Sequence, residues 1–440
     1  MGFDIFHKTV TIFPAHNGEE PAVSAQNGKS MRTFLIIWIG QVFSSVGTVA
    51  ARFAIIWWIA SRTGSATALA TVAIMDQLPH VLLGPFAGAL VDRWNRKRVL
   101  IASDGLIALA SLLLAVLFWM DQIQVWHVFV VMLFRSVVFT FYSPAMAVVT
   151  TLLVPEKHLT RVAGMNQTLG GALNIIGPML GALLLVLLPL HSIMLVDLFT
   201  AVVAIVPLAL VRVSSPPVSA RRQSVFADVR DGARYIRAWP GLVVLLAGAV
   251  LANFLINPPL VLTPLLVKNY FGGGAVELSW MESAFGFGIV AGGLTLSAWG
   301  GFKRKVWTIL MGVAASGVGM FIVGLAPASA ILVAVAGMFV IGVTLALINA
   351  PVMALLQSTV ATEVQGRVFG LVGTLSGMAA PLGLAIAGPM ADRIGIQPMY
   401  IIAGVAFMAM AAAFSFSKPL MRIEEDAAVI RAANGAAPAV

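Results

Sequence analysis

The chain has 440 residues, of which 60% are hydrophobic and only 10% are charged, whereas a soluble domain carries about 25% charged residues. This composition excludes a soluble globular protein and indicates an integral membrane protein. The sequence contains no cysteine, which excludes disulfide and thiol chemistry.

A transmembrane helix needs about 20 mostly apolar residues, and polar breaks divide this chain into twelve such runs. Runs of this length exclude a membrane β-barrel, whose strands alternate in polarity over about 10 residues. We therefore predict an all-α integral membrane protein with 12 transmembrane helices. The predicted spans are 33–60, 67–91, 99–120, 125–150, 160–188, 191–212, 241–268, 277–299, 306–326, 329–353, 366–391 and 397–417.

The positions of the basic residues predict the orientation in the membrane. The net charge of +9 would suit nucleic-acid binding, but 22 of the 27 Lys and Arg residues lie in the tails and the even-numbered loops. The opposite side carries only Arg62, Lys268 and Arg393, while Arg52 and Arg135 fall within spans. This asymmetry follows the positive-inside rule. We therefore expect both termini to be cytoplasmic and no nucleic-acid partner.

Along the chain we predict two bundles, a linker and two tails. The linker begins with a Pro-Pro pair, after which apolar residues recur near helical spacing among arginines. That pattern predicts an amphipathic helix on the cytoplasmic membrane surface. The five regions are a cytoplasmic tail at 1–31, a six-helix bundle at 32–212, the linker at 213–240, a second six-helix bundle at 241–418 and a cytoplasmic tail at 419–440.

Ionisable residues interrupt the first two spans. Asp76 and His80 lie four residues apart, on one face of the second span, with Pro79 between them. Such a site can exchange a proton between about pH 5 and 8, as a proton carrier requires. Arg52 in the first span is the simplest partner for Asp76, and Asp197 in the sixth span is another buried charge to account for. The alternative is a buried polar network that only fixes helix packing.

The segment GPFAGALVDRWNRKRVL closes the second span. Gly84 and Gly88 form a pair that lets another helix approach closely. Asn95 stands in the following turn, where a left-handed backbone favours glycine and then asparagine. The acidic and basic residues of the turn are Asp92, Arg93, Arg96, Lys97 and Arg98. Basic residues alone would anchor topology, but that does not explain the acid before them.

Arg135 lies deep in the fourth span, where an arginine costs several kcal/mol unless it is paired or hydrated. The matching position in the second half of the chain is Gly342, so the charge is not needed to build the helix. One interpretation is a role in coupling or a structural ion pair. The other is that the side chain extends toward the membrane surface.

The two halves of the chain resemble each other. SPAMAVVTTLLVPEKHLTRVAG (Ser143–Gly164) and APVMALLQSTVATEVQGRVFG (Ala350–Gly370) share Pro, Met and Arg-Val-x-Gly positions. Six-helix halves repeated in parallel are typical of secondary transporters, with the substrate site between the halves near the middle of the membrane. This pattern predicts a transporter.

Two further sets of residues are candidates for function. Gly177, Pro178 and Gly181 predict close packing and a hinge in the fifth span. Asn253 and Asn257, followed by two prolines, lie on one face of a seventh helix that we expect to be broken. Candidates for the substrate surface are Gln41, Phe53, Trp57, Met146, Asn174, Asn253, Asn257, Glu282, Asn349 and Met353.

The segments GPFAGALVDRWNRKR, LFRSVVFTFYSPA, LLVPEKHLT and GRVFGLVGTLSG resemble the major facilitator superfamily, and within it the macrolide-efflux branch of drug:proton antiporters. The resemblance implies two pseudo-symmetric six-helix bundles. It also implies that Asp92 and its arginines hold a cytoplasmic gate against the start of helix eleven, with Asp104 as a further partner. It assigns Arg135 to proton coupling. The roles of Asp76 and His80 rest on the residues alone.

The expected function is export of macrolide-like or other bulky amphipathic compounds by proton antiport in the bacterial inner membrane. The alternatives are an exporter or flippase of a lipid or siderophore, and a receptor or enzyme without transport. The sequence lacks nucleotide-binding and zinc-hydrolase motifs, so no enzymatic activity is expected. The expected partners are a small-molecule substrate, protons and membrane lipids, with no metal and no cofactor, and the chain is expected to be a monomer.

Overall fold

The computed structural model describes residues 30–211, 225–361 and 364–426, and all regular elements within these ranges are helices. Twelve of these helices are long and apolar enough to cross a membrane, which confirms the predicted fold class. Their ends differ from the predicted spans by a few residues. Most of both predicted tails and part of the linker lie outside the described residues, so the domain limits stay predictions.

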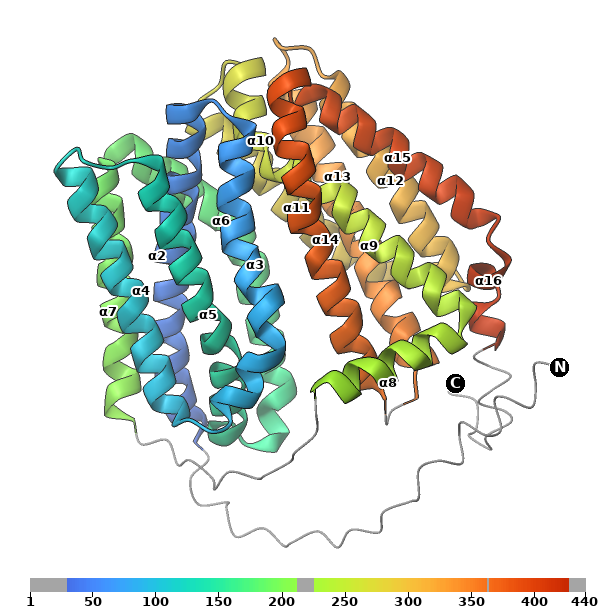
Figure 1. Ribbon diagram of the computed structural model, residues 1–440, viewed down its shortest axis with the longest axis horizontal. Helices are drawn as coiled ribbons and strands as arrows, with labels where there is room; N and C mark the ends of the chain where they lie inside the picture. The colour runs from blue at the N-terminus through green and yellow to red at the C-terminus, as the bar shows by residue number, and fades with distance from the viewer. Residues whose placement is uncertain (1–29, 212–224, 362–363, 427–440) are drawn as a thin grey trace, which may run out of the picture.

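The helices form two bundles that stand side by side (Figure 1). The first contains α2 (Met31–Thr63), α3 (Ala66–Val91), α4 (Arg96–Trp119), α5 (Val125–Leu153), α6 (Leu159–Leu187) and α7 (Leu190–Leu210). The second contains α9 (Pro240–Val261), α10 (Thr263–Leu265), η3 (Leu266–Tyr270), α11 (Ala275–Trp299), α12 (Lys305–Leu325), α13 (Ile331–Thr359), α14 (Gln365–Ile394) and α15 (Gln397–Ser415). Shorter elements are η2 (Glu156–His158) and α16 (Lys418–Met421).

The predicted helix in the linker is α8 (Val225–Ala238), which lies across one end of the second bundle in Figure 1. Its Asp231 carboxylate is 3.9 Å from the Arg367 guanidinium at the start of α14. Ile236 is buried, so an apolar side of α8 packs on the second bundle. We call this end of the molecule the linker end, and the opposite end, which carries the α2–α3 turn, the far end.

Local sequence explains where several helices start. Ser65 accepts a hydrogen bond from the Ala68 N–H and caps α3, and Asn95 does the same for Arg98 in α4. Asn95 has a φ of −72°, so the expectation of a left-handed turn residue there was wrong. Gly64, at φ 63°, is the left-handed residue that ends α2.

The repeated segments occupy equivalent places in the two bundles. Pro144 lies inside α5 and Pro351 inside α13. Val162 near the start of α6 and Val368 near the start of α14 are both buried. The seventh helix is broken as predicted, because α9 ends after its two prolines and continues through α10 into a π-helical turn.

The bundles differ at the position that matches Arg135. A Cβ added at Gly342 in α13 would lie 2.1 Å from the Phe285 carbonyl oxygen of α11, and one added at Gly288 would lie 2.2 Å from the Phe339 carbonyl oxygen. The second bundle therefore brings two backbones together where the first bundle has a charged side chain.

The two bundles touch at the far end and separate toward the linker end, as the helices in Figure 1 show. At the far end, a Cβ added at Gly388 in α14 would lie 2.8 Å from the Ala70 Cβ of α3. Toward the linker end, a Cβ added at Gly84 or Gly88 of α3, or at Gly370 of α14, would have nothing within 4 Å. The expectation that Gly84 and Gly88 admit a neighbouring helix is therefore wrong for this conformation, which is open at the linker end.

Candidate functional site

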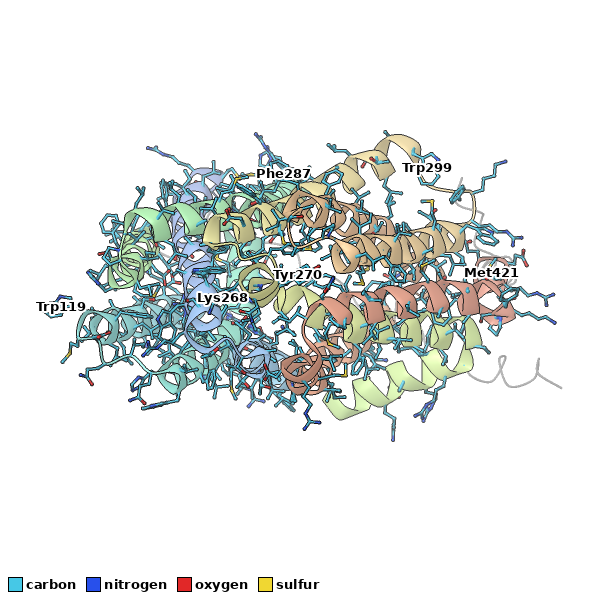
Figure 2. All side chains as sticks on the ribbon, turned by 90° about the horizontal axis from the view of Figure 1, so that it is seen from above. Trp119, Lys268, Tyr270, Phe287, Trp299 and Met421 are labelled. Atoms are coloured by element: carbon cyan, nitrogen blue, oxygen red, sulfur yellow. The ribbon has the colours of Figure 1, made fainter. Side chains whose placement is uncertain are left out.

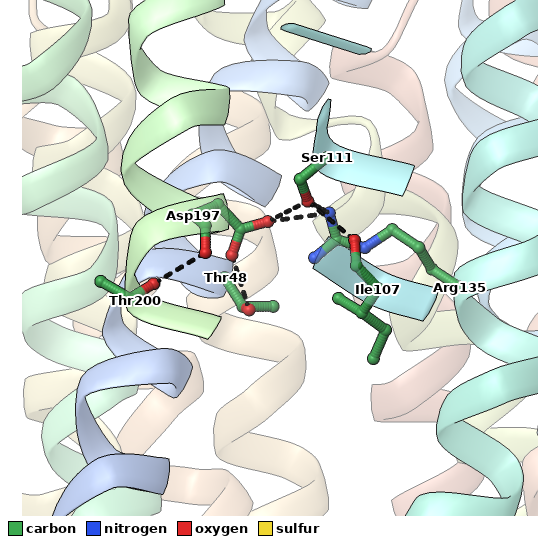
Figure 3. Close-up of polar contacts among 6 residues, drawn as sticks. All are labelled: Thr48, Ile107, Ser111, Arg135, Asp197 and Thr200. Atoms are coloured by element: carbon green, nitrogen blue, oxygen red, sulfur yellow. Dashed lines mark hydrogen bonds and ion pairs between the residues drawn. The ribbon is translucent and has the colours of Figure 1, made fainter. Parts of the chain in front are cut away.

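The deepest charged group in the first bundle is an ion pair between α5 and α7. Arg135 Nη1 lies 3.0 Å from Asp197 Oδ2 (Figure 3), and the two side chains are 10% and 0% exposed. Ser111 of α4 donates to Asp197 Oδ2 at 2.6 Å and accepts from Arg135 at 3.0 Å. Thr48 of α2 donates to the other Asp197 oxygen at 2.9 Å. Four helices are thus joined through one carboxylate.

This network settles what neutralises Arg135. The arginine is paired inside the bundle, so the alternative that it extends toward the membrane surface is wrong. Asp197 therefore pairs with Arg135 and is not the partner of Asp76 and His80 in the second span. Both residues are candidates from the sequence but are not paired there, although two opposite charges in two apolar spans of one bundle are a signal for an ion pair.

A second ion pair joins α2 and α3, as expected from the sequence. Arg52 Nη2 lies 2.8 Å from Asp76 Oδ2, but these side chains are 52% and 21% exposed. The Ser136 hydroxyl of α5 donates to the Asp76 backbone carbonyl and fixes this part of α3 on the bundle. The pair is therefore held at a defined place while remaining accessible.

His80 lies one turn further along α3 and is half-buried. Its Nδ1 is 2.8 Å from the Thr140 hydroxyl, and its ring packs edge-on against Phe139. The hydrogen-bond partner of His80 is therefore Thr140 rather than Asp76.

The second bundle contributes one acid to this region. Glu282 of α11 is half-buried, and the charge of Arg52 acts on it across the two bundles. Arg52 therefore has Asp76 in direct contact, and Glu282 is the acid of the other bundle that lies near enough for its charge to act on Arg52. We call Arg52, Asp76, His80 and Glu282 the central charged cluster.

A third network lies nearer the linker end. Gln41 of α2 donates to Asp104 Oδ2 at 3.0 Å and accepts from the Tyr142 hydroxyl at 2.6 Å. Asp104 is buried, and its hydrogen bond comes from Gln41 rather than from the arginines of the turn. Among the described residues, the hydrogen-bond partner of Asp104 is therefore Gln41 and not the gate arginines that were expected. Tyr142 was not among the residues expected from the sequence.

The described contacts of the basic turn after α3 stay within the first bundle. Arg96 Nη2 bonds the Asp92 carbonyl at 3.1 Å and lies 3.6 Å from its carboxylate, which is 61% exposed. Lys97 donates to the Ala209 and Val211 carbonyls at the end of α7, so it stabilises that helix terminus. Arg93 and Arg98 are exposed. Within the described residues, no ion pair joins this turn to α14.

The remaining substrate-surface candidates divide by exposure. Phe53 is buried and packs against Gly181 of α6, so its assignment to that surface was wrong. Asn253 and Asn257 each donate to a carbonyl of their own helix. Two further candidates, Trp57 and Met146, are partly buried and pack against the hydrophobic cores. The candidates Asn174, Asn349 and Met353 are exposed.

The predicted hinge in α6 is a packing site in this structure. Gly177, Pro178 and Gly181 are buried within one unbroken helix. A Cβ added at Gly177 would lie 2.2 Å from Val49 Cγ1, and one at Gly181 would lie 2.7 Å from the Phe53 ring. These glycines therefore hold α6 close to α2.

Replacing Arg135 with methionine should destabilise the protein by about 3–5 kcal/mol, because Asp197 would be left buried and uncompensated. The double variant Arg135→Met/Asp197→Leu should recover most of that loss. Arg52→Met, at a half-exposed pair, should cost about 1 kcal/mol or less. Thermal unfolding of the purified protein in detergent measures all three. A double variant no more stable than Arg135→Met would contradict the ion-pair account.

Comparison with known proteins agrees with this architecture. The Major Facilitator Superfamily model matches residues 37–384. Macrolide efflux protein A of Streptococcus pyogenes is 33% identical over 382 residues, which cover 86% of this chain and 94% of that protein. Multidrug efflux pump Tap of Mycolicibacterium fortuitum is 29% identical over 387 residues, covering 83% of this chain and 91% of that protein.

Solved structures show the same fold at low identity. A bacterial homologue of the iron transporter ferroportin, in an inward-facing state, has a TM-score of 0.66 at 15% identity, covering 87% of this chain and all of that chain (100%). A D-xylose-proton symporter has a TM-score of 0.65 at 11% identity, covering 87% and 96%. The family model and the relatives cover most of the sequence, and the chain therefore belongs to the Major Facilitator Superfamily.

Proposed function

We propose that this protein exports macrolide-like or other bulky amphipathic compounds across the bacterial inner membrane in exchange for protons. The macrolide efflux and multidrug efflux relatives support the substrate class. The central charged cluster supports proton exchange, because it combines an accessible ion pair with a carboxylate from the opposite bundle.

The proposed orientation places the linker end in the cytoplasm. The first turns of α4 and α6 and the α11–α12 connection carry basic residues at this end, as the positive-inside rule requires of a cytoplasmic face; these residues are Lys97, Arg98, Arg161 and Lys303. The structure, which is open at the linker end, then corresponds to the inward-facing state. In that state a compound from the cytoplasm or the inner leaflet reaches the surfaces between the bundles.

The exchange step follows from the charges. With Asp76 ionised, Arg52 is held at 2.8 Å and its charge is largely neutralised. A proton that binds Asp76 removes this attraction and leaves Arg52 free to turn toward Glu282. Because the two carboxylates belong to different bundles, the choice of partner biases how the bundles sit relative to each other. Release of the proton on the other side returns Arg52 to Asp76.

The buried pair has a different place in this proposal. Asp197 is fully buried and Arg135 nearly so, so proton exchange there requires the network of Ser111 and Thr48 to open first. We therefore assign to Arg135 and Asp197 the rigidity of the first bundle. The accessible cluster carries the exchange.

Reconstitution into liposomes tests the function directly. A fluorescent macrolide should move in the direction opposite to the flow of protons that an imposed pH gradient drives. The direction of movement should reverse when the gradient is reversed. A gradient of sodium alone, with the pH clamped, should move none. If the macrolide stays still under both polarities while a labelled lipid or a siderophore moves, the lipid or siderophore alternative holds instead.

Replacing Asp76 with asparagine should reduce gradient-driven accumulation by about tenfold, within the range of coupling free energies between linked sites. The amide cannot take up the proton, so binding of the macrolide should persist while its dependence on pH is lost. The same liposome assay, with binding measured separately, checks this. Asp121→Asn, at an exposed acid in the α4–α5 turn, is the control that should transport normally. Unchanged pH dependence in Asp76→Asn would remove Asp76 from the exchange step.

Replacing Glu282 with glutamine should weaken the binding of cationic compounds more than that of neutral ones. Loss of a charge-assisted contact costs about 1.5–3 kcal/mol, so a cationic amphipathic compound should bind at least about tenfold more weakly. A neutral compound of similar size should be affected little. Dissociation constants for a matched pair of such compounds test this, and equal losses for both would exclude Glu282 as a site for the cation.

A further inference from the structure

Two charged side chains of the second bundle close the far end, and each one caps a helix of the first bundle. The Asp392 carboxylate, in the last turn of α14, accepts from the Ala66 and Thr67 backbone N–H groups at 2.5 and 3.0 Å and from the Ser65 hydroxyl at 3.1 Å. These groups form the start of α3, where unpaired N–H groups and the helix dipole favour a negative charge.

The second contact places a positively charged side chain at the C-terminal end of a helix. Lys268 Nζ, in the π-helical turn η3, donates to the Ala60 and Ser61 carbonyls at 3.1 and 2.6 Å. These carbonyls belong to the last turn of α2, where a positive charge is favoured. Figure 2, which looks at the far end from above, shows Lys268 where the two bundles meet. Both charges are therefore complementary to the helix ends they contact.

The sequence around Asp392 repeats that at the end of α3, just before the basic turn, at the other end of the molecule. Gly388-x-x-x-Asp392-Arg393 in α14 has the spacing of Gly88-x-x-x-Asp92-Arg93 in α3. In α14 the glycine is what allows α3 to approach, since its added Cβ would lie 2.8 Å from the Ala70 Cβ.

The direction of the two helices makes these positions reciprocal. α3 runs from the far end to the linker end, and α14 packs against it and runs the opposite way. Each helix therefore carries an aspartate at its C-terminal end, on the side of the membrane where the other helix begins. In this structure Asp392 caps α3, whereas the Asp92 side chain is 61% exposed.

We propose that Asp392, supported by Lys268, is the extracellular latch of the transport cycle and the counterpart of Asp92 at the cytoplasmic end. Asp392 caps α3 while the protein faces inward, and it must release those N–H groups before the far end opens. Closing one end of the α3–α14 pair opens the other, so the two aspartates are engaged in turn. The proposal rests on alternating access and is independent of the substrate.

The test measures the conformational equilibrium without substrate or gradient, so its failure is separate from a failure of the transport assays. Because the chain has no cysteine, spin labels can be attached to introduced cysteines in the full protein. One pair at the far end is Gln122→Cys with Ser329→Cys, and one at the linker end is Lys157→Cys with Lys303→Cys. All four positions are exposed. Pulsed electron paramagnetic resonance then gives the distance distributions across each end.

Asp392→Asn should shift the ratio of outward-facing to inward-facing protein upward by roughly tenfold, given the usual strength of a charged cap. The far-end distance should lengthen and the linker-end distance should shorten together. Lys268→Met should shift the ratio in the same direction. Asp92→Asn should shift it the opposite way, and Asp392→Glu should stay near the unmodified protein. Asp121→Asn, an exposed acid at the same end, should leave both distances unchanged.

Three outcomes would overturn the latch. The first is an Asp392→Asn protein with unchanged distances. The second is a shift in the same direction for Asp92→Asn and Asp392→Asn. The third is a far-end change without the matching linker-end change, which would indicate only a local packing role. If Asp392→Asn does not yield folded protein, Lys268→Met decides the question by the same readout.

Discussion

An ionised side chain in the hydrocarbon core is costly unless it is paired or hydrated, and this constraint organises the first bundle. Asp197 meets it completely, with Arg135 at 3.0 Å and hydroxyl groups from two more helices. The cost of separating these charges keeps α2, α4, α5 and α7 together as one body. A rigid body of this kind is what a rocking transporter needs, since motion between bundles is useful only if each bundle keeps its shape.

The accessible pair contrasts with the buried one. Arg52 and Asp76 are similarly close, at 2.8 Å, but they are half and one-fifth exposed, so they are not sealed inside the bundle. The charge of Arg52 also acts on Glu282 of the other bundle. In the proposed function, the same two residue types therefore serve packing where they are enclosed and proton exchange where they are open. Exposure and the neighbouring bundle, rather than residue type, separate the two roles.

Charges also act at the ends of the helices, where backbone groups lack partners. Lys97 caps the end of α7 within its own bundle, while Asp392 and Lys268 cap α3 and α2 across the bundles. Contacts within a bundle are kept throughout a rigid-body motion, whereas contacts across bundles must break. In the proposed cycle, the cross-bundle caps are therefore among the contacts through which the sequence sets the balance between the two facing states.

The sequence by itself determined the membrane fold, the number of spans, the duplicated plan, the helix in the linker and the Arg52–Asp76 pair. These follow from hydrophobic length, internal repetition and the cost of a lone charge, which are local or pairwise properties. Only the tertiary structure decided that Asp197 belongs to Arg135, that Phe53 is buried against Gly181 and that Asp104 bonds Gln41. It also decided which end is open, and so left Asp92 exposed and Asp392 engaged. The physical reason is that partners far apart in the chain are chosen by how helices rotate and pack, and spacing along one helix does not contain that information.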